Sequence, residues 1–228
     1  MIRIDNVSKK FDDLIVLDKV SFEVPPAQLV VILGPSGTGK TVLLKAIMGL
    51  LPVDHGEVFI DGQSVQQATI EQLYDMRKKI GFVFQGAALF DSMNVRGNIA
   101  LPLNEHTKLS SREIRAKVIK ILDIVGLPGK DHLYPRSLSG GMKRLVSIGR
   151  ALALDPEYLF YDEPTTGLDP IMKDRIVSLI VNLKKTYQKS GIVVTHDLDT
   201  AQAIGDIVYM LKNGSINRLQ KIGKEYYG

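Results

Sequence analysis

Residues 34–41 read GPSGTGKT, and this stretch contains the residue types that are needed to hold a polyphosphate. It matches the pattern G-x-x-x-x-G-K-[ST], in which the glycines let the backbone wrap tightly around an anion. An apolar run, QLVVIL, precedes the loop, and VLLKAIMGLL follows it. A helix that starts here would add unpaired N–H groups and the positive end of its dipole. We therefore predict a nucleotide-binding loop made of Gly34, Pro35, Ser36, Gly37, Thr38, Gly39, Lys40, Thr41 and Val42.

Individual residues of the loop and of a later strand have the chemistry for phosphoryl transfer. Lys40 is expected to contact the β- and γ-phosphates, and the Thr41 hydroxyl is expected to bind Mg²⁺. The run YLFYDE at 158–163 supplies two carboxylates at the end of an apolar strand. Asp162 is expected to hold Mg²⁺, directly or through water, and Glu163 to act as the general base toward the attacking water. The alternative is an acidic strand end before a proline turn, and the phosphate loop favours the catalytic interpretation.

A third motif, LSGGMKRL at 138–145, places two glycines before a helix-like run. Because glycine is unfavourable inside a helix, Gly140 and Gly141 are expected in the first helical turn, with Ser139 as the N-cap. The backbone N–H groups of that turn have no partner within the helix and point outward.

The elements that must position these residues follow an α/β pattern. Alternation in MIRIDNV, LIVLDKVSFEV and GEVFID predicts antiparallel strands within the first sixty residues. The continuously apolar QLVVIL predicts a central strand covered on both faces. A mostly helical stretch near 86–157 is inserted between the strand-rich halves, and a further helix is expected near 171–189. Asn213-Gly214 predicts a hairpin turn.

The clearest amphipathic helix covers residues 110–125. Ser110 and Glu113 form a capping box, and apolar residues then recur at helical spacing. Asp199 and Gln202 look like a second capping pair, to which we assign no chemistry. The basic residues of the first helix are interpreted as a solvated face rather than a binding patch; they are Arg112, Arg115, Lys117 and Lys120.

Composition sets limits on the class of protein. The 228 residues, 45% apolar and 24% charged, are typical of a soluble globular protein with one large domain or two small ones. A net charge of +4 does not argue for nucleic acid, which is not an expected partner. The chain has no cysteine, which excludes disulfides and thiolate metal sites. No apolar run is long enough to span a membrane and no signal peptide is visible, so any role at a membrane is expected to be peripheral.

With these motifs in order, the sequence closely resembles the ATP-binding subunits of ABC transporters along essentially its whole length. The resemblance implies that Phe11 stacks on adenine, that Gln85 in GFVFQ touches Mg²⁺ and the attacking water, and that His196 contacts the γ-phosphate. LSGGM is the signature motif of that family, and Asp169 in GLD lies in the loop that crosses the dimer. Taken alone, Phe11 fits a core or surface aromatic and Asp169 fits a helix N-cap; the joint order of the motifs favours the family roles.

The resemblance implies an α/β P-loop NTPase of the ABC type, with a RecA-like core, an N-terminal antiparallel β-subdomain and an inserted α-helical subdomain. We expect a single ATPase domain over 1–228, in which 1–85 and 158–228 form the core with the β-subdomain and 86–157 form the helical signature subdomain. Two copies of the chain are implied to face head to tail as a homodimer, with each ATP between the phosphate loop of one chain and the signature of the other. The signature residues are Ser139, Gly140, Gly141 and Met142.

One departure from the usual family signature points to a particular group of ABC transporters. The family signature usually ends in Gln, and Met142 stands here. Together with the loop FVFQGAALFDSMNVRGNIALPL, it resembles the ATPases of Mla/Mce-type lipid transporters. This implies an ATP-hydrolysing motor on the cytoplasmic face of the inner membrane that drives phospholipid transport across the cell envelope. Its partners would be an integral membrane permease, contacting roughly residues 86–101, and an MCE-domain lipid-binding protein. The small and apolar residues of that segment fit a permease groove and subdomain core equally well; they are Ala87, Ala88, Leu89, Phe90 and Met93.

Two other functions stay open. One is a transporter motor for another substrate, such as amino acids or lipoproteins; the other is a soluble ABC ATPase for assembly of a cofactor. Copurified membrane partners would discriminate between them. Members of the lipid-transport family can carry a C-terminal extension that embraces the neighbouring subunit. Only about a dozen residues follow the Asn213-Gly214 turn, so we do not expect such an exchange here.

Overall fold

The computed structural model describes residues 1–220, and the chain divides into two compact units. The first unit contains Met1–Lys78 and the chain from Ile180 onward, and the second contains Lys79–Leu179. The subdomain bounds expected from the sequence stay a prediction. Residues 221–228 lie outside the described part, and so does most of the C-terminal segment for which we expected no subunit exchange.

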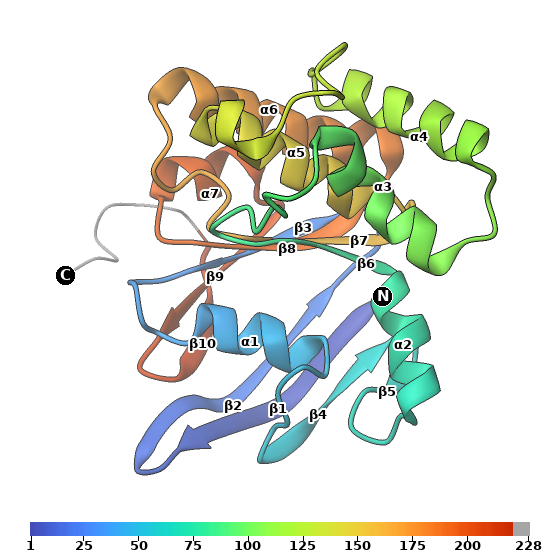
Figure 1. The fold of residues 1–228 in the computed structure, drawn as a ribbon. Helices are drawn as coiled ribbons and strands as arrows, with labels where there is room; N and C mark the ends of the chain where they lie inside the picture. Colours follow the sequence, from blue (N-terminus) through green and yellow to red (C-terminus); the bar gives the residue numbers. More distant parts are fainter. Residues whose placement is uncertain (221–228) are drawn as a thin grey trace. The chain divides into compact units, whose positions relative to one another are not determined.

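The first unit contains an antiparallel sheet with strand order β2-β1-β4-β5, drawn in blue and cyan in Figure 1. Ile2 faces Val24 of β2 on one side and Ile60 of β4 on the other, and all three side chains are buried. The alternation read from the sequence therefore places one face of this sheet in the core. The strands are β1 (Ile2–Phe11), β2 (Leu14–Val24), β4 (His55–Ile60) and β5 (Gln63–Ser64), followed by helix α2 (Ile70–Lys78).

A parallel arrangement in the same unit positions the phosphate loop. Strand β3 (Leu29–Leu33) pairs in parallel with β8 (Ser190–Thr195) and with β9 (Ile207–Lys212). All five residues of β3 are buried, which confirms the predicted central strand. Strand β9 returns into β10 (Ser215–Arg218) through Asn213 and Gly214, whose φ angles of 52° and 78° confirm the predicted hairpin turn. Helix α1 (Lys40–Ile47) follows the loop after β3.

The predicted capping pair of Asp199 and Gln202 is wrong. Helix α7 spans Leu198–Ile204, and the Asp197 carboxylate caps it by accepting a hydrogen bond of 2.9 Å from the Thr200 N–H. Because β8 ends at Thr195, the chain turns into the helix two residues earlier than the sequence pattern suggested. Asp199 lies instead in the first helical turn, where a carboxylate is favourable to the helix dipole.

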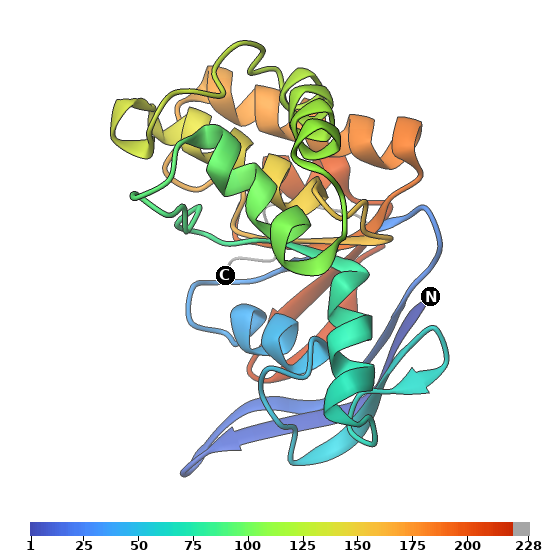
Figure 2. The ribbon, with the colours of Figure 1, turned by 45° about the vertical axis from the view of Figure 1, so that its right-hand side comes forward.

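The second unit combines a parallel strand pair with a group of helices. Strands β6 (Ile80–Val83) and β7 (Tyr158–Asp162) pair in parallel, and helix α5 packs against β6. Helices α3 and α4, drawn in green, lie side by side (Figures 1 and 2). The predicted capping box of α4 is confirmed, since Ser110 and Glu113 bond reciprocally. The helices are α3 (Val95–His106), α4 (Ser111–Ile124), the 3₁₀ turn η1 (Pro135–Ser137), α5 (Gly140–Leu152) and α6 (Pro170–Tyr187), inside which the boundary between the units falls.

Candidate functional site

The predicted phosphate loop lies between β3 and α1 and is shaped around Lys40. The Lys40 side chain is 6% exposed, and its ammonium donates to the carbonyl oxygens of Gly34, at 2.8 Å, and Pro35, at 2.9 Å. The Thr38 hydroxyl donates to Pro35 O at 2.9 Å as well. The loop is therefore held in a curved conformation by its own side chains, with the lysine inside the curve.

The three glycines of the loop are required for different reasons. A side chain at Gly34 would overlap the Leu211 carbonyl oxygen of β9. Gly37 has a φ of +82° and open space around it, so its backbone angle alone favours glycine. Gly39 has a φ of +96°, and a Cβ there would also lie 2.5 Å from Val16 Cγ1 of β2. This last contact places the β1–β2 hairpin against the end of the loop.

Two other predicted residues of the first unit, His196 and Phe11, lie on elements that adjoin this loop. His196 directly follows β8, whose last residue Thr195 faces Leu33, so His196 and Gly34 leave neighbouring strands at the same edge. The Gly34 N–H donates to Thr195 O at 3.2 Å. Phe11 ends β1 and is 42% exposed, and the Lys9 ammonium lies 5.4 Å from the centre of its ring. The aromatic residue is thus available on the surface of the hairpin that contacts the loop.

In the second unit, Gln85 and the two carboxylates lie beyond the same edge of the β6–β7 pair. Val83 faces Tyr161, so Gln85 and Glu163 each follow that pair by two residues. Asp162 and Glu163 are buried, at 5% and 7% exposure. Glu163 has a φ of +49°, which is unusual for a side-chain-bearing residue, and Thr166 Oγ1 donates to its Oε2 at 3.0 Å. The backbone and Thr166 together fix the direction of this carboxylate.

Sequence reasoning missed two arginines of α5 that hold the segment after β6. The Arg144 guanidinium donates to Phe84 O at 2.5 Å, and that of Arg150 donates to Ala88 O at 2.8 Å and Ala87 O at 3.1 Å. Burial lowers the pKa of Arg144, and the Asp162 carboxylate opposes this shift, so the two groups lie in one electrostatic environment. The signal in the sequence was the presence of these two arginines among the mostly apolar and small residues of the helix.

A buried asparagine holds the rest of that segment. Asn98 of α3 is fully buried; its amide oxygen accepts from the Phe90 N–H at 2.8 Å, and its amide nitrogen donates to Phe90 O, Met93 O and Asn94 O at 3.0–3.1 Å. Ala87 and Ala88 both have positive φ, of 61° and 48°. These side-chain bonds hold the segment in a conformation that neither helix nor strand would provide.

The signature motif forms the first turn of α5, as predicted. The Ser139 hydroxyl caps the helix by accepting from the Met142 N–H at 3.2 Å. The two glycines differ: a Cβ on Gly141 would overlap Met172 of α6, whereas a Cβ on Gly140 would meet no atom within 4 Å. Gly140 is exposed, and its helical backbone does not require glycine. Only Gly141 is explained by packing among the described residues.

Asp169 lies at the start of α6, next to the helix that carries the signature. Its carboxylate accepts from the Met172 N–H at 3.0 Å, which confirms the N-cap interpretation. Met172 is the residue that closes over Gly141. The GLD loop and the signature are therefore joined by one methionine contact in this unit.

The three residues predicted to bind Mg²⁺ each carry an oxygen donor of the kind that a hard divalent cation prefers. Thr41 offers a hydroxyl, Gln85 an amide and Asp162 a carboxylate, which are ligand types that suit Mg²⁺. Within residues 1–220, no group of three or more His, Cys, Asp or Glu could enclose a metal.

No helix among the described residues has the length and hydropathy of a membrane-spanning segment.

Comparison with known proteins gives a consistent result. Residues 17–166 match the ABC transporter family. The chain is 39% identical over 216 residues to the intermembrane phospholipid transport system ATP-binding protein MlaF of Haemophilus influenzae, covering 95% of this chain and 82% of that protein. It is 38% identical over 210 residues to the probable ribonucleotide transport ATP-binding protein mkl of Mycobacterium leprae, covering 92% of this chain and 60% of that protein. Among solved structures, the ATP-binding cassette MJ0796 in a dimeric post-hydrolysis state with ADP and Pi superposes with a TM-score of 0.88 at 32% identity, covering 98% of this chain and 99% of that one.

The contrast between the two signature glycines predicts different effects of alanine. Gly141→Ala must displace the flexible Met172 side chain, and it should lower the unfolding free energy by no more than about 1 kcal/mol, because alanine also favours the helix. Gly140→Ala should leave stability unchanged or slightly raised, because alanine favours a helix and meets no neighbour. Urea denaturation of both variants tests this. The Met172→Ala change should reduce the cost of Gly141→Ala, and strict additivity of the two changes would contradict the contact.

Proposed function

The chain belongs to the ABC transporter family and is an ATP-hydrolysing subunit, and from this premise we propose that it drives phospholipid transport across the cell envelope. The fold class predicted from the sequence, an α/β ABC-type ATPase, is confirmed by the likeness to solved cassettes. The observation that carries the choice of substrate is the 39–40% identity to MlaF phospholipid transport proteins over most of the chain. We propose that the subunit is peripheral, on the cytoplasmic face of the inner membrane, bound to a permease and through it to an MCE-domain protein.

We propose that ATP is held mainly by the first unit. The loop N–H groups and the Lys40 ammonium would bind the β- and γ-phosphates, and Phe11 would stack on the adenine. Thr41, Asp162 and Gln85 would hold Mg²⁺, whose chemistry there would be to offset the negative charge of the phosphates. Two observations support this assignment: the loop is curved, and the buried Lys40 ammonium lies inside the curve, where it bonds to loop carbonyl oxygens.

For hydrolysis, we propose that Glu163 accepts the proton of the attacking water while Gln85 orients that water. His196 would contact the γ-phosphate from the neighbouring strand edge. The hydrogen bond from Thr166 supports this role for Glu163, since it fixes the carboxylate in one orientation. Bond formation between the water oxygen and phosphorus would release ADP and phosphate, with the water proton on the Glu163 carboxylate.

We further propose that the site is completed by a second copy of the chain. Ser139 Oγ and the N–H groups at Gly140 and Gly141 would bind the γ-phosphate of the ATP held by the other subunit, and Asp169 would cross the same seam. The exposure of Gly140 supports this proposal. A Cβ at this position would meet no atom of the described residues within 4 Å, so packing within the chain does not explain the glycine. The dimeric state of the MJ0796 cassette fits the same arrangement. ATP would then hold the dimer closed, and hydrolysis would open it.

Glu163→Gln should lower ATP turnover by at least ~100-fold, because the amide cannot accept the water proton. It should retain ATP binding and increase the fraction of dimer in the presence of ATP, which size-exclusion chromatography can measure. Glu157→Gln removes a carboxylate near the start of β7 and serves as the matched control, with turnover near that of the unchanged protein. Unaltered hydrolysis in Glu163→Gln would remove this residue from the role of base.

Ser139→Arg should abolish hydrolysis while leaving ATP binding to the monomer nearly intact. The added guanidinium would occupy the space of the partner's nucleotide, whereas the phosphate loop of the same chain is unchanged. Fluorescent ATP titration at concentrations too low for dimer formation, alongside a steady-state ATPase assay, separates the two effects. Equal loss of monomer binding would contradict a role across the dimer.

The transport function is tested by the partners and by reconstitution. The affinity-tagged chain, purified from detergent-solubilised membranes, should recover a permease and an MCE-domain protein. In proteoliposomes, that complex should transfer fluorescent phospholipid only with hydrolysable ATP. Recovery of a periplasmic solute-binding protein instead, or transport of ribonucleotides without lipid transfer, would refute the lipid assignment. Absence of the chain from membranes in cells that contain the permease would favour a soluble assembly ATPase.

A further inference from the structure

A lysine ammonium lies over the ring of Phe11, the aromatic residue that we assign to the nucleotide base. Lys9 precedes Phe11 by two residues on β1, and its Nζ lies 5.4 Å from the centre of the ring. This distance is within the range of a cation–π interaction. The two residues differ in environment, because Lys9 is 9% exposed and Phe11 is 42% exposed. The cation therefore covers one face of the ring, and Phe11 remains open to solvent elsewhere.

The ammonium is held in place by a carboxylate of the segment before β4. Lys9 Nζ donates to Asp54 Oδ1 at 2.8 Å. The other oxygen of that carboxylate, Oδ2, accepts from the Lys10 N–H at 2.6 Å. The hydrogen bond from Lys9, and then that from Lys10, lower the pKa of Asp54, which keeps the carboxylate charged at neutral pH. Both oxygens of Asp54 thus bind the end of β1 directly before Phe11.

The connection between β1 and the segment before β4 does not require the ammonium. Backbone groups already make this connection, because the Asp54 N–H donates to Ser8 O at 2.9 Å and the Lys10 N–H donates to the Asp54 carboxylate. Burial of a lysine carries a desolvation cost, and a buried ion pair is often no more stabilising than apolar side chains of similar size. Local stability therefore does not explain a cation at residue 9, whereas its position over the Phe11 ring does.

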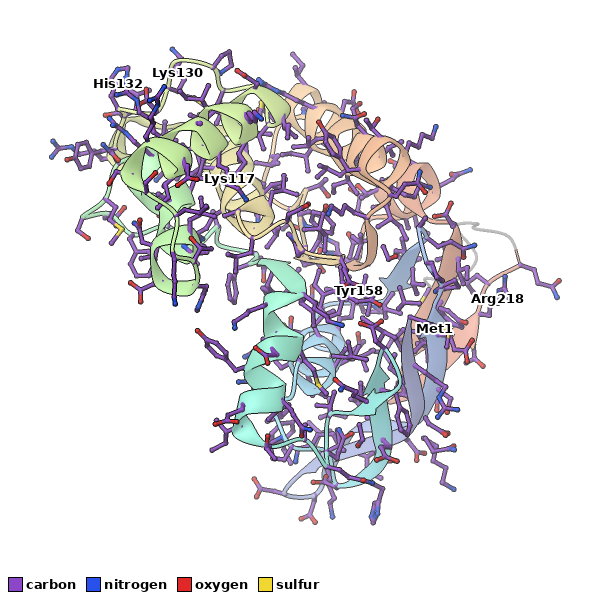
Figure 3. All side chains as sticks on the ribbon, turned by 90° about the vertical axis from the view of Figure 1, so that its right-hand side faces the viewer. Met1, Lys117, Lys130, His132, Tyr158 and Arg218 are labelled. Carbon is purple, nitrogen blue, oxygen red and sulfur yellow. The ribbon has the colours of Figure 1, made fainter. Side chains whose placement is uncertain are left out.

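Other cations near β1 are placed differently. The Lys10 side chain is 51% exposed, and its ammonium lies 3.5 Å from the Asp13 carboxylate at the hairpin turn. The amino group of Met1, labelled in Figure 3, lies at the opposite end of β1 and pairs with Asp61 at 2.8 Å in an exposed position. Of the two adjacent lysines of β1, the buried one is therefore the one that lies on the ring.

A cation on one face of an aromatic ring changes the opposite face. The π electrons give both faces of a phenyl ring a partial negative charge. An ammonium on one side draws these electrons toward itself, so the opposite face becomes less negative. A purine that stacks there meets less repulsion, because its own faces are also rich in π electrons. The same contact restricts rotation of the ring, which reduces the entropy that is lost when a base stacks on it.

We propose that Lys9, held by Asp54, is a positioning residue for the nucleotide base, which fixes the Phe11 ring and prepares its open face to stack on a purine. The inference rests on the proposed function, in which Phe11 stacks on adenine. Lys9 acts through the ring and touches neither the base nor the phosphates. Its loss should therefore reduce the affinity for the base and not the affinity for the triphosphate, which depends on the loop around Lys40.

The variants Lys9→Met and Lys10→Met of the full chain form a matched pair. Each removes one positive charge and retains an unbranched side chain, but only the first removes the cation from the ring. Calorimetry without Mg²⁺, which prevents hydrolysis, measures the dissociation constants of ATP and of inorganic tripolyphosphate, which has no base. Lys9→Met should weaken ATP binding by about three- to tenfold and leave tripolyphosphate binding within about twofold. Lys10→Met should leave both within about twofold.

Further variants test whether the effect passes through the ring. Lys9→Arg should bind ATP within about twofold of the unchanged chain, because a guanidinium also interacts with an aromatic face. In a chain that carries Phe11→Ala, Lys9→Met should weaken ATP binding no further. In steady-state assays, Lys9→Met should raise the KM for ATP and leave kcat within about twofold. Asp54→Ala releases the ammonium without removing it and should also weaken ATP binding selectively, which provides a second test if Lys9→Met does not fold.

Three results would overturn the role of Lys9 while the proposed function stands. They are unchanged ATP binding in Lys9→Met, an equal loss of ATP and tripolyphosphate binding, and a further loss of ATP binding when Lys9→Met is added to Phe11→Ala. A different result separates the two proposals. If Phe11→Ala alone leaves ATP binding unchanged, the stacking on adenine in the proposed function fails, and the role of Lys9 fails with it.

Discussion

A buried ammonium group must find oxygen acceptors, and Lys40 takes two of them from the loop that precedes it. The rest of the first unit is arranged around this requirement. Strand β3, enclosed by β8 and β9, fixes where the loop begins, and the β1–β2 hairpin limits where it ends. Because the loop is already curved, binding of a polyphosphate would not have to order it, which reduces the entropy cost of association.

Helix α5 has a comparable role in the second unit. Its first turn carries the signature residues, while Arg144 and Arg150 further along the helix hold the backbone carbonyls after β6. A rigid helix thus connects two segments that we assign to different surfaces, the dimer seam and the permease side. The segment after β6 and the signature are therefore held by the same helix.

The sequence predicted the elements whose signals are local. The apolar run of β3, the capping box of α4 and the Asn213-Gly214 turn all depend on residues close together in the chain. Features that depend on contacts between residues far apart in the chain could not be predicted from the sequence. At Ala87 and Ala88, where φ is positive, the carbonyl oxygens accept hydrogen bonds from Arg150, 63 and 62 residues further along the chain, and alanine itself does not predict such angles. Likewise, Gly140 and Gly141 look equivalent in the sequence, and only the position of Met172 in the structure distinguishes them.

The positive φ angle of Glu163 has one further consequence. A left-handed backbone costs a side-chain-bearing residue roughly 1–2 kcal/mol, and glycine would avoid most of that cost. At this position, the substitution that best relieves the backbone also removes the carboxylate proposed as the base. If Glu163 is the base, as proposed, directed evolution of this chain for heat resistance alone would favour a more stable subunit with lower turnover. Under that proposal, a screen for durable variants has to score catalysis in parallel, because at residue 163 the two properties are in conflict.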